Sequence, residues 1–133
     1  MTQATAASTF KVLVVEDSPQ VRDRLLDMLD SIDGVDAIGS ADRADVAVTR
    51  ILAERPDAVI LDINLAQGSG LDVLRAVHQA APGVEFWMHT NYADEPYRAV
   101  CRRLGAARFF DKSSDFEQMR ESIVARAAQL RIH

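Results

Sequence analysis

Short apolar runs alternate along the chain with longer segments in which apolar residues recur every three or four positions. Runs of the first kind indicate β-strands, and the second spacing indicates helices that bury one face. The predicted strands are residues 11–15, 35–39, 58–61, 84–89 and 108–110. Because a helical segment follows each strand, the pattern predicts an α/β fold in which helices cover both faces of a parallel sheet.

Two helix starts are marked by their own residues. Ser18 followed by Pro19 predicts the start of the first helix, because serine caps free backbone N–H groups and proline suits the first helical position. Ser114, with Glu117 three places later, has the pattern of a capping box and predicts the start of the fifth helix. These boundaries therefore have a local chemical cause as well as a hydrophobic pattern.

Length and composition favour one globular domain. A chain of 133 residues, 48% hydrophobic and 26% charged, is long enough for one hydrophobic core and too short for two ordinary domains. We expect a flexible tail over residues 1–9 and the folded domain over residues 10–133. The tail lacks the pattern of a signal peptide and no apolar stretch is long enough to span a bilayer, so we expect a cytoplasmic protein without a membrane partner.

Charge, cysteine and histidine usage argue against other classes of protein. The net charge of −5 comes with no long basic run, which disfavours direct nucleic-acid binding. Cys101 is the sole cysteine and lies in a helical pattern, where a packed thiol is expected rather than a reactive one. His78, His89 and His133 lack the spacing of metal ligands, so no histidine metal site is expected.

Polar residues follow four of the predicted strands. The first strand ends at Glu16 and Asp17, the third at Asp62, the fourth at Thr90 and the fifth at Lys112. Crossovers between parallel strands are right-handed, and ligands of doubly wound sheets bind at the carboxyl ends of the strands. We therefore expect these side chains to meet in one crevice.

The acidic side chains of this crevice need a neutralising partner. Glu16, Asp17 and Asp62 would repel one another and raise one another's pKa unless a cation neutralised them. Because the candidate ligands are oxygens, they favour a hard ion such as Mg²⁺. A carboxylate beside such an ion is a suitable nucleophile toward a phosphoryl group when donors also meet the transferring oxygens. Thr90 supplies a hydroxyl for that purpose, and Lys112 supplies an ammonium.

Five segments, taken in order, resemble response-regulator receiver domains of two-component signalling, and the likeness runs from about residue 10 to the C-terminus. The segments are Val-Leu-Val-Val-Glu-Asp-Ser at 12–18, Val-Ile-Leu-Asp-Ile-Asn-Leu at 59–65, Gly-Ser-Gly-Leu-Asp-Val-Leu at 68–74, Met-His-Thr at 88–90 and Phe-Phe-Asp-Lys at 109–112. The resemblance implies a flavodoxin-like, doubly wound sheet of five parallel strands in the order 2-1-3-4-5 with five helices.

The resemblance also implies a role for each acidic residue of the crevice. Asp62 would accept a phosphoryl group from a histidine phosphate. Mg²⁺ would be held by Glu16, Asp17, Asp62 and the backbone carbonyl of Asn64, with Glu16 acting through water. The chain would then be a phosphoprotein that assists its own phosphorylation and dephosphorylation, and not an enzyme acting on other substrates.

The remaining family positions concern the phosphoryl oxygens and the output of the signal. Thr90 and Lys112 would hold the phosphoryl oxygens, and movement of Thr90 with rotation of Phe109 would carry the change to the fourth helix, fifth strand and fifth helix. The resemblance therefore implies a stand-alone response regulator. Its partners would be a sensor histidine kinase or histidine phosphotransfer protein and a protein target, and a homodimer formed on phosphorylation stays open.

One departure from the family pattern follows the lysine. Most receivers carry proline immediately after it, often with a cis bond, whereas Ser113 follows Lys112 here. A cis bond before serine costs about 2.5–4 kcal/mol. We therefore expect a trans bond, with Ser113 or Ser114 capping the fifth helix and Lys112 still reaching Asp62.

Other functions are weighed against the same residues. A Mg²⁺-dependent phosphatase of the haloacid-dehalogenase type would need a carboxylate where Asn64 stands. A flavodoxin-like nucleotide or flavin binder would need glycines and backbone amides after the first strand, where Val-Glu-Asp-Ser-Pro stands at 15–19. A phosphate shuttle within a phosphorelay and a receiver-shaped binding module locked in one state both stay open.

Overall fold

The computed structural model describes residues 9–132, so the expected flexible tail lies, apart from Thr9, outside the described residues. Strands and helices alternate along the chain, as the hydrophobic pattern predicts. The elements are β1 (Phe10–Val15), α1 (Pro19–Asp30), β2 (Val35–Ala41), α2 (Ala44–Glu54), β3 (Ala58–Leu61), α3 (Gly70–Val77), β4 (Glu85–Thr90), α4 (Tyr97–Arg103), β5 (Arg108–Asp111) and α5 (Phe116–Ile132). Within the described chain, no helix combines the length and hydropathy needed to cross a membrane.

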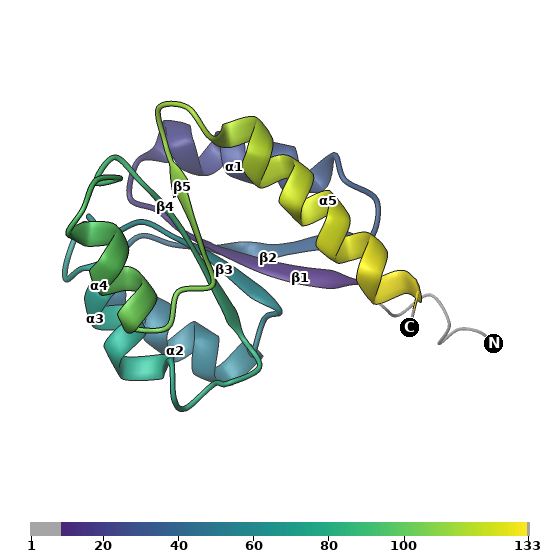
Figure 1. Ribbon diagram of the computed structural model, residues 1–133. Helices are drawn as coiled ribbons and strands as arrows, with labels where there is room; N and C mark the ends of the chain where they lie inside the picture. Colours follow the sequence, from purple (N-terminus) through teal and green to yellow (C-terminus); the bar gives the residue numbers. More distant parts are fainter. Residues whose placement is uncertain (1–8, 133) are drawn as a thin grey trace.

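The strands form one parallel sheet in the order β2-β1-β3-β4-β5, which confirms the predicted fold class and strand order. Figure 1 shows α1 and α5 on one face of the sheet and α2, α3 and α4 on the other. Because all strands run the same way, their carboxyl ends share one edge of the sheet. The loops that follow the strands therefore meet at that edge.

Two apolar cores lie on the two faces of the sheet. On the side of α1 and α5, the Trp87 ring lies between Phe10 and Phe110, with ring centroids 6.2 and 6.0 Å apart. All four residues of β3 are buried, because this central strand faces helices on both sides. Asp62 follows β3 directly, so its backbone is anchored by the most buried strand of the molecule.

The helix starts agree in part with their sequence signals. Ser18 caps α1 as predicted, its Oγ accepting a hydrogen bond from Val21 N at 3.4 Å. The predicted capping box of Ser114 and Glu117 is wrong. The fifth helix begins at Phe116, so Asp115 precedes it, and Ser114 Oγ donates to Asp115 Oδ1 at 3.0 Å.

Gly70, the first residue of α3, is required by a close approach of two backbone segments. A methyl group at this position would lie 2.2 Å from the backbone oxygen of Asp62. Gly70 N also donates to Ile63 O at 2.8 Å, which ties the helix start to the chain just after the strand. The small residue therefore lets α3 support the loop that carries Asp62.

We predict that Gly70→Ala lowers the free energy of unfolding by about 1–3 kcal/mol, because the added methyl group overpacks the Asp62 backbone. Gly83→Ala is the matched control, since a methyl group there would have no atom of residues 9–132 within 4 Å. Urea unfolding of both variants measures the difference. Equal stability of the two variants would show that the loop carrying Asp62 shifts to accommodate the methyl group without a loss of stability.

Candidate functional site

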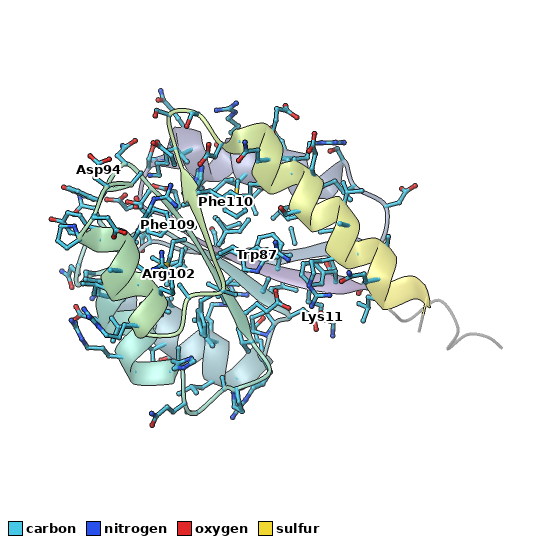
Figure 2. All side chains as sticks on the ribbon, viewed as in Figure 1. Lys11, Trp87, Asp94, Arg102, Phe109 and Phe110 are labelled. Carbon is cyan, nitrogen blue, oxygen red and sulfur yellow. The ribbon has the colours of Figure 1, made fainter. Side chains whose placement is uncertain are left out.

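The residues that follow β1, β3, β4 and β5 line one hollow of about 220 Å³ at the carboxyl edge of the sheet. Its lining residues are Glu16, Asp17, Ser18, Asp62, Asn64, Thr90, Asn91, Tyr92 and Lys112. The structure therefore gathers all the candidate metal and phosphoryl residues of the sequence analysis. Phe109 lies elsewhere, on the α4 side of β5 (Figure 2).

Lys112 is placed between two buried carboxylates. Its Nζ lies 2.7 Å from Asp62 Oδ2 and 2.8 Å from Glu16 Oε1, and its side chain is only 13% exposed. Burial works to lower the pKa of Lys112, but its hydrogen bonds and its attraction to Asp62 and Glu16 outweigh burial and leave that pKa raised. Lys112 is therefore held in its charged form beside Asp62.

Glu16 is a buried carboxylate whose pKa is raised. Burial raises the pKa of Glu16, and the negative charge of Asp62 adds to the rise. Lys112 and the backbone N–H of Ser18, which donates to Glu16 Oε2 at 3.0 Å, work in the opposite direction without cancelling it. A further cation at this position would favour the ionised form of Glu16.

The acidic residues are arranged as a cation site requires. Glu16, Asp17 and Asp62 each offer a carboxylate oxygen, and these oxygens lie within 4.8 Å of one another. Asp62 Oδ1 is buried and has no hydrogen-bond partner among residues 9–132. A buried carboxylate oxygen without a partner is costly, and a hard cation would satisfy it. The donor set, all oxygens, fits Mg²⁺, and Asn64 lies beside it in the lining of the hollow.

Thr90 connects the hollow to the loop after β4. Thr90 is fully buried, and its Oγ1 accepts a hydrogen bond from Tyr92 N at 3.2 Å. The backbone of Lys112 donates to Thr90 O at 3.0 Å, which fixes β5 against β4 at this edge. Tyr92 also lines the hollow, and sequence analysis does not select it because loop residues carry no periodic signal.

The turn after Lys112 is stabilised by two aspartates in place of a proline. Asp111 Oδ1 accepts from Ser113 N at 2.8 Å and from Ser113 Oγ at 2.7 Å, while Asp115 Oδ2 accepts from Asp111 N at 2.9 Å. The hydrogen bonds from Ser113 lower the pKa of Asp111. The Lys112–Ser113 bond is trans and Lys112 reaches Asp62, as expected, but neither serine takes the capping position before α5.

His89 precedes Thr90 in β4 and is 3% exposed. Burial, and then the positive charge of Lys112, lower the pKa of His89 to about 4. The imidazole is therefore neutral at pH 7 and adds no charge to the neighbouring carboxylates. The positive charge beside Asp62 comes from Lys112.

A parallel 2-1-3-4-5 sheet with an acidic hollow and a lysine at its carboxyl edge defines a doubly wound α/β domain with a charged ligand site at that edge. The chain matches the model of the response regulator receiver domain family over residues 12–124 and belongs to that family. It is thus a receiver domain of a response regulator in two-component signalling. Members of this family bind Mg²⁺ at an acidic pocket.

Curated relatives are longer than this chain. The response regulator GacA of Pseudomonas aeruginosa is 28% identical over 113 residues, which are 85% of this chain and 53% of GacA. The DNA-binding transcriptional activator DevR/DosR of Mycobacterium tuberculosis is 32% identical over 85 residues, 64% of this chain and 39% of that protein. The chain therefore spans about half the length, or less, of these relatives.

Solved structures confirm the fold. The response regulator domain of Thermotoga maritima CheB matches with a TM-score of 0.79 and 24% identity, covering 94% of this chain and 98% of that one. The CheY-like receiver domain protein of Methanospirillum hungatei matches with a TM-score of 0.81 and 23% identity, covering 92% and 97%. At these identities the likeness establishes the shared fold.

We predict that Lys112→Met lowers the free energy of unfolding by about 3–5 kcal/mol at pH 7, because it leaves two buried carboxylates without their cation. Without Lys112 the pKa of Glu16, already raised by burial, loses one of the contacts that lower it and rises further, so the loss of stability shrinks as the pH falls through that pKa. Millimolar Mg²⁺ should also reduce this loss in the free energy of unfolding. Urea unfolding at pH 7 and at about pH 4, with and without Mg²⁺, measures these effects.

The chain offers a matched control, since its other lysine, Lys11, is exposed and lies outside the hollow. Lys11→Met should change the free energy of unfolding by less than about 0.5 kcal/mol under the same conditions. A Lys112→Met variant as stable as Lys11→Met at pH 7 would mean that the carboxylates do not depend on Lys112.

Proposed function

We propose that Asp62 accepts a phosphoryl group from a phosphorylated histidine of a sensor kinase or phosphotransfer protein, in a Mg²⁺-dependent reaction. The proposal rests on the different contacts of the two Asp62 carboxylate oxygens. One oxygen is held by Lys112 at 2.7 Å, and the other is buried without a partner among the described residues. With a cation at the oxygen without a partner, the oxygen beside Lys112 would serve as the nucleophile, and the ammonium would stay next to it.

The transfer forms a bond between an Asp62 carboxylate oxygen and phosphorus and breaks the bond between phosphorus and the histidine nitrogen. The bonding electrons return to that nitrogen, and the phosphoryl group becomes an acyl phosphate on Asp62. Lys112 and the Thr90 hydroxyl donate to the phosphoryl oxygens and so stabilise the charge in transfer. A Mg²⁺ ion held by Glu16, Asp17, Asp62 and the carbonyl of Asn64 would neutralise the remaining negative charge.

We propose further that Thr90 and Phe109 report phosphorylation to the surface formed by α4, β5 and α5. Tyr92 N donates to Thr90 Oγ1, so a movement of Thr90 Oγ1 toward a phosphoryl oxygen would pull on the loop that carries Tyr92. The Tyr92 ring lies 5.1 Å from the ring of Tyr97, the first residue of α4, so a shift of this loop reaches the helix directly. Rotation of Phe109 into space vacated by Thr90 would change the same surface, which a protein target then reads.

We predict that Asp62→Asn abolishes phosphorylation by acetyl phosphate or phosphoramidate, because an amide is no nucleophile. Mass spectrometry of the intact protein, with millimolar Mg²⁺ and with excess chelator, measures incorporation. Asp42→Asn is the control, since Asp42 also follows a strand but is exposed and lies outside the hollow. Undiminished phosphorylation of Asp62→Asn, or of the natural chain without divalent cation, would refute the reaction.

We predict that beryllofluoride with Mg²⁺, which mimics the phosphoryl group, shifts amide NMR signals over residues 92–116 as well as those of the hollow. The reason is the link from Thr90 through Tyr92 to α4. Asp62→Asn should remove both sets of shifts. Changes confined to the hollow would exclude the switch and favour a phosphate shuttle, whose partner needs access to Asp62 alone.

A further inference from the structure

The strand β2 lies at one edge of the sheet, where within residues 9–132 it pairs with β1 only. An edge strand presents backbone N–H and C=O groups to which a strand of another molecule can bond. The residues of β2 do little to prevent such pairing. Its sequence, Val-Asp-Ala-Ile-Gly-Ser-Ala at 35–41, contains no proline and no lysine, and Asp36 is its one charged residue. Protection of this edge therefore has to come from residues outside the strand.

The second half of β2 contains a β-bulge. The register between β1 and β2 shifts by one residue, so that Ile38 has no partner in β1. Gly39 follows with a φ of +131°, a backbone conformation that L side chains rarely adopt. Ala41 O accepts from Glu16 N at 2.9 Å and therefore faces β1. Because carbonyl directions alternate along a strand, Ser40 O points away from β1, toward the open edge.

The guanidinium of Arg50, in α2, covers this part of the edge. Its Nη2 donates to Ile38 O at 2.8 Å, and its Nη1 donates to Ser40 O at 3.2 Å. Two carbonyl groups that an added strand would use are therefore bonded to a side chain of their own molecule. A methyl group at Gly39 would lie 2.7 Å from Arg50 Nη1, so the glycine of the bulge leaves room for the guanidinium.

Arg50 is itself held by Glu54, one helical turn later in α2. Its Nε donates to Glu54 Oε2 at 2.7 Å, and its Nη2 donates to Glu54 Oε1 at 3.0 Å. The hydrogen bonds between them raise the pKa of Arg50 and lower the pKa of Glu54. A guanidinium carries five N–H donors in a planar fork, so it can serve one carboxylate and two carbonyls at once, which the single ammonium of a lysine cannot do.

We propose that Arg50 is a clamp that closes the β2 edge against a second copy of this chain. Two copies related by a two-fold axis would bring their β2 strands together in antiparallel orientation, and identical edges would then bond to each other. With the clamp in place, the carbonyls of Ile38 and Ser40 are already used, and a charged side chain stands between the two strands. Without it, the like charges of the two Asp36 side chains are the remaining barrier in the strand.

The clamp is independent of phosphoryl transfer to Asp62. It lies at the β2 edge of the sheet, whereas the acidic hollow is lined by residues that follow β1, β3, β4 and β5. None of the residues that form the clamp lines that hollow. A failure of the clamp proposal would therefore leave the proposed function unaffected, and the reverse also holds.

Analytical ultracentrifugation of the full chain and of Arg50→Ala, over a range of protein concentrations, tests the clamp. We expect Arg50→Ala to lower the dissociation constant for self-association at least about tenfold, because each copy regains two free carbonyl acceptors. Arg43→Ala is the matched control. Arg43 also pairs with a carboxylate of α2, Asp45, but its side chain bonds to Asp45 and Gln67 rather than to β2, so self-association should not change.

Amide hydrogen exchange followed by NMR identifies the surface that pairs. In Arg50→Ala, the amides of residues 35–40 should exchange more slowly as the protein concentration rises. Arg50→Lys takes the place of Arg50→Ala if the latter does not fold, since it keeps the charge beside Glu54 but cannot cover both carbonyls. A variant that self-associates no more than Arg43→Ala, or protection that appears outside β2, would overturn the proposal. Concentration-dependent protection of residues 35–40 in the natural chain would overturn it as well.

Discussion

The contact of Lys112 with Glu16 and Asp62 is the interaction on which the site depends. Two carboxylates are buried at the edge of a parallel sheet, where desolvation works against their charged forms. One ammonium lies within 2.8 Å of both, and one oxygen of Asp62 is left without a hydrogen-bond partner in the described part of the chain. Two negative charges therefore face one positive charge, so the site still favours a further cation or another ligand at Asp62.

The fold brings these three charged side chains together. Parallel strands bring their carboxyl ends to one edge, so the residues after β1, β3 and β5 meet although they are distant along the chain. Gly70 permits α3 to approach the backbone of Asp62 closely, and the aspartates around Ser113 shape the turn that carries Lys112. Local geometry at each strand end thus converts a common α/β sheet into a charged site.

Sequence reasoning predicted the elements, and it predicted that the residues after the strands line one hollow, because both depend on regular patterns. Strands and helices follow from hydrophobic periodicity, and the positions of Asp62, Thr90 and Lys112 follow from where strands end. The misplaced cap at Ser114 has a different cause, since Asp115 stands one residue closer to the helix and competes for the same role. Tyr92 and the stacking of Arg98 on Phe109 depend on loop conformation and tertiary packing, which no local pattern encodes.

The strand β5 joins the α4 side of the sheet to the hollow around Asp62, because Lys112 follows this strand directly. Phe109 packs on the α4 side of β5, where the Arg98 guanidinium lies over its ring, whereas Lys112, three residues later, reaches Asp62. The Lys112 backbone is fixed to Thr90, and Thr90 is tied to the loop that leads into α4. In the proposed switch, a ligand bound by Lys112 and Thr90 would therefore act on both the strand and the loop that leads into the helix. Because these contacts are hydrogen bonds and ring contacts of modest energy, the proposed switch requires no change of the sheet itself.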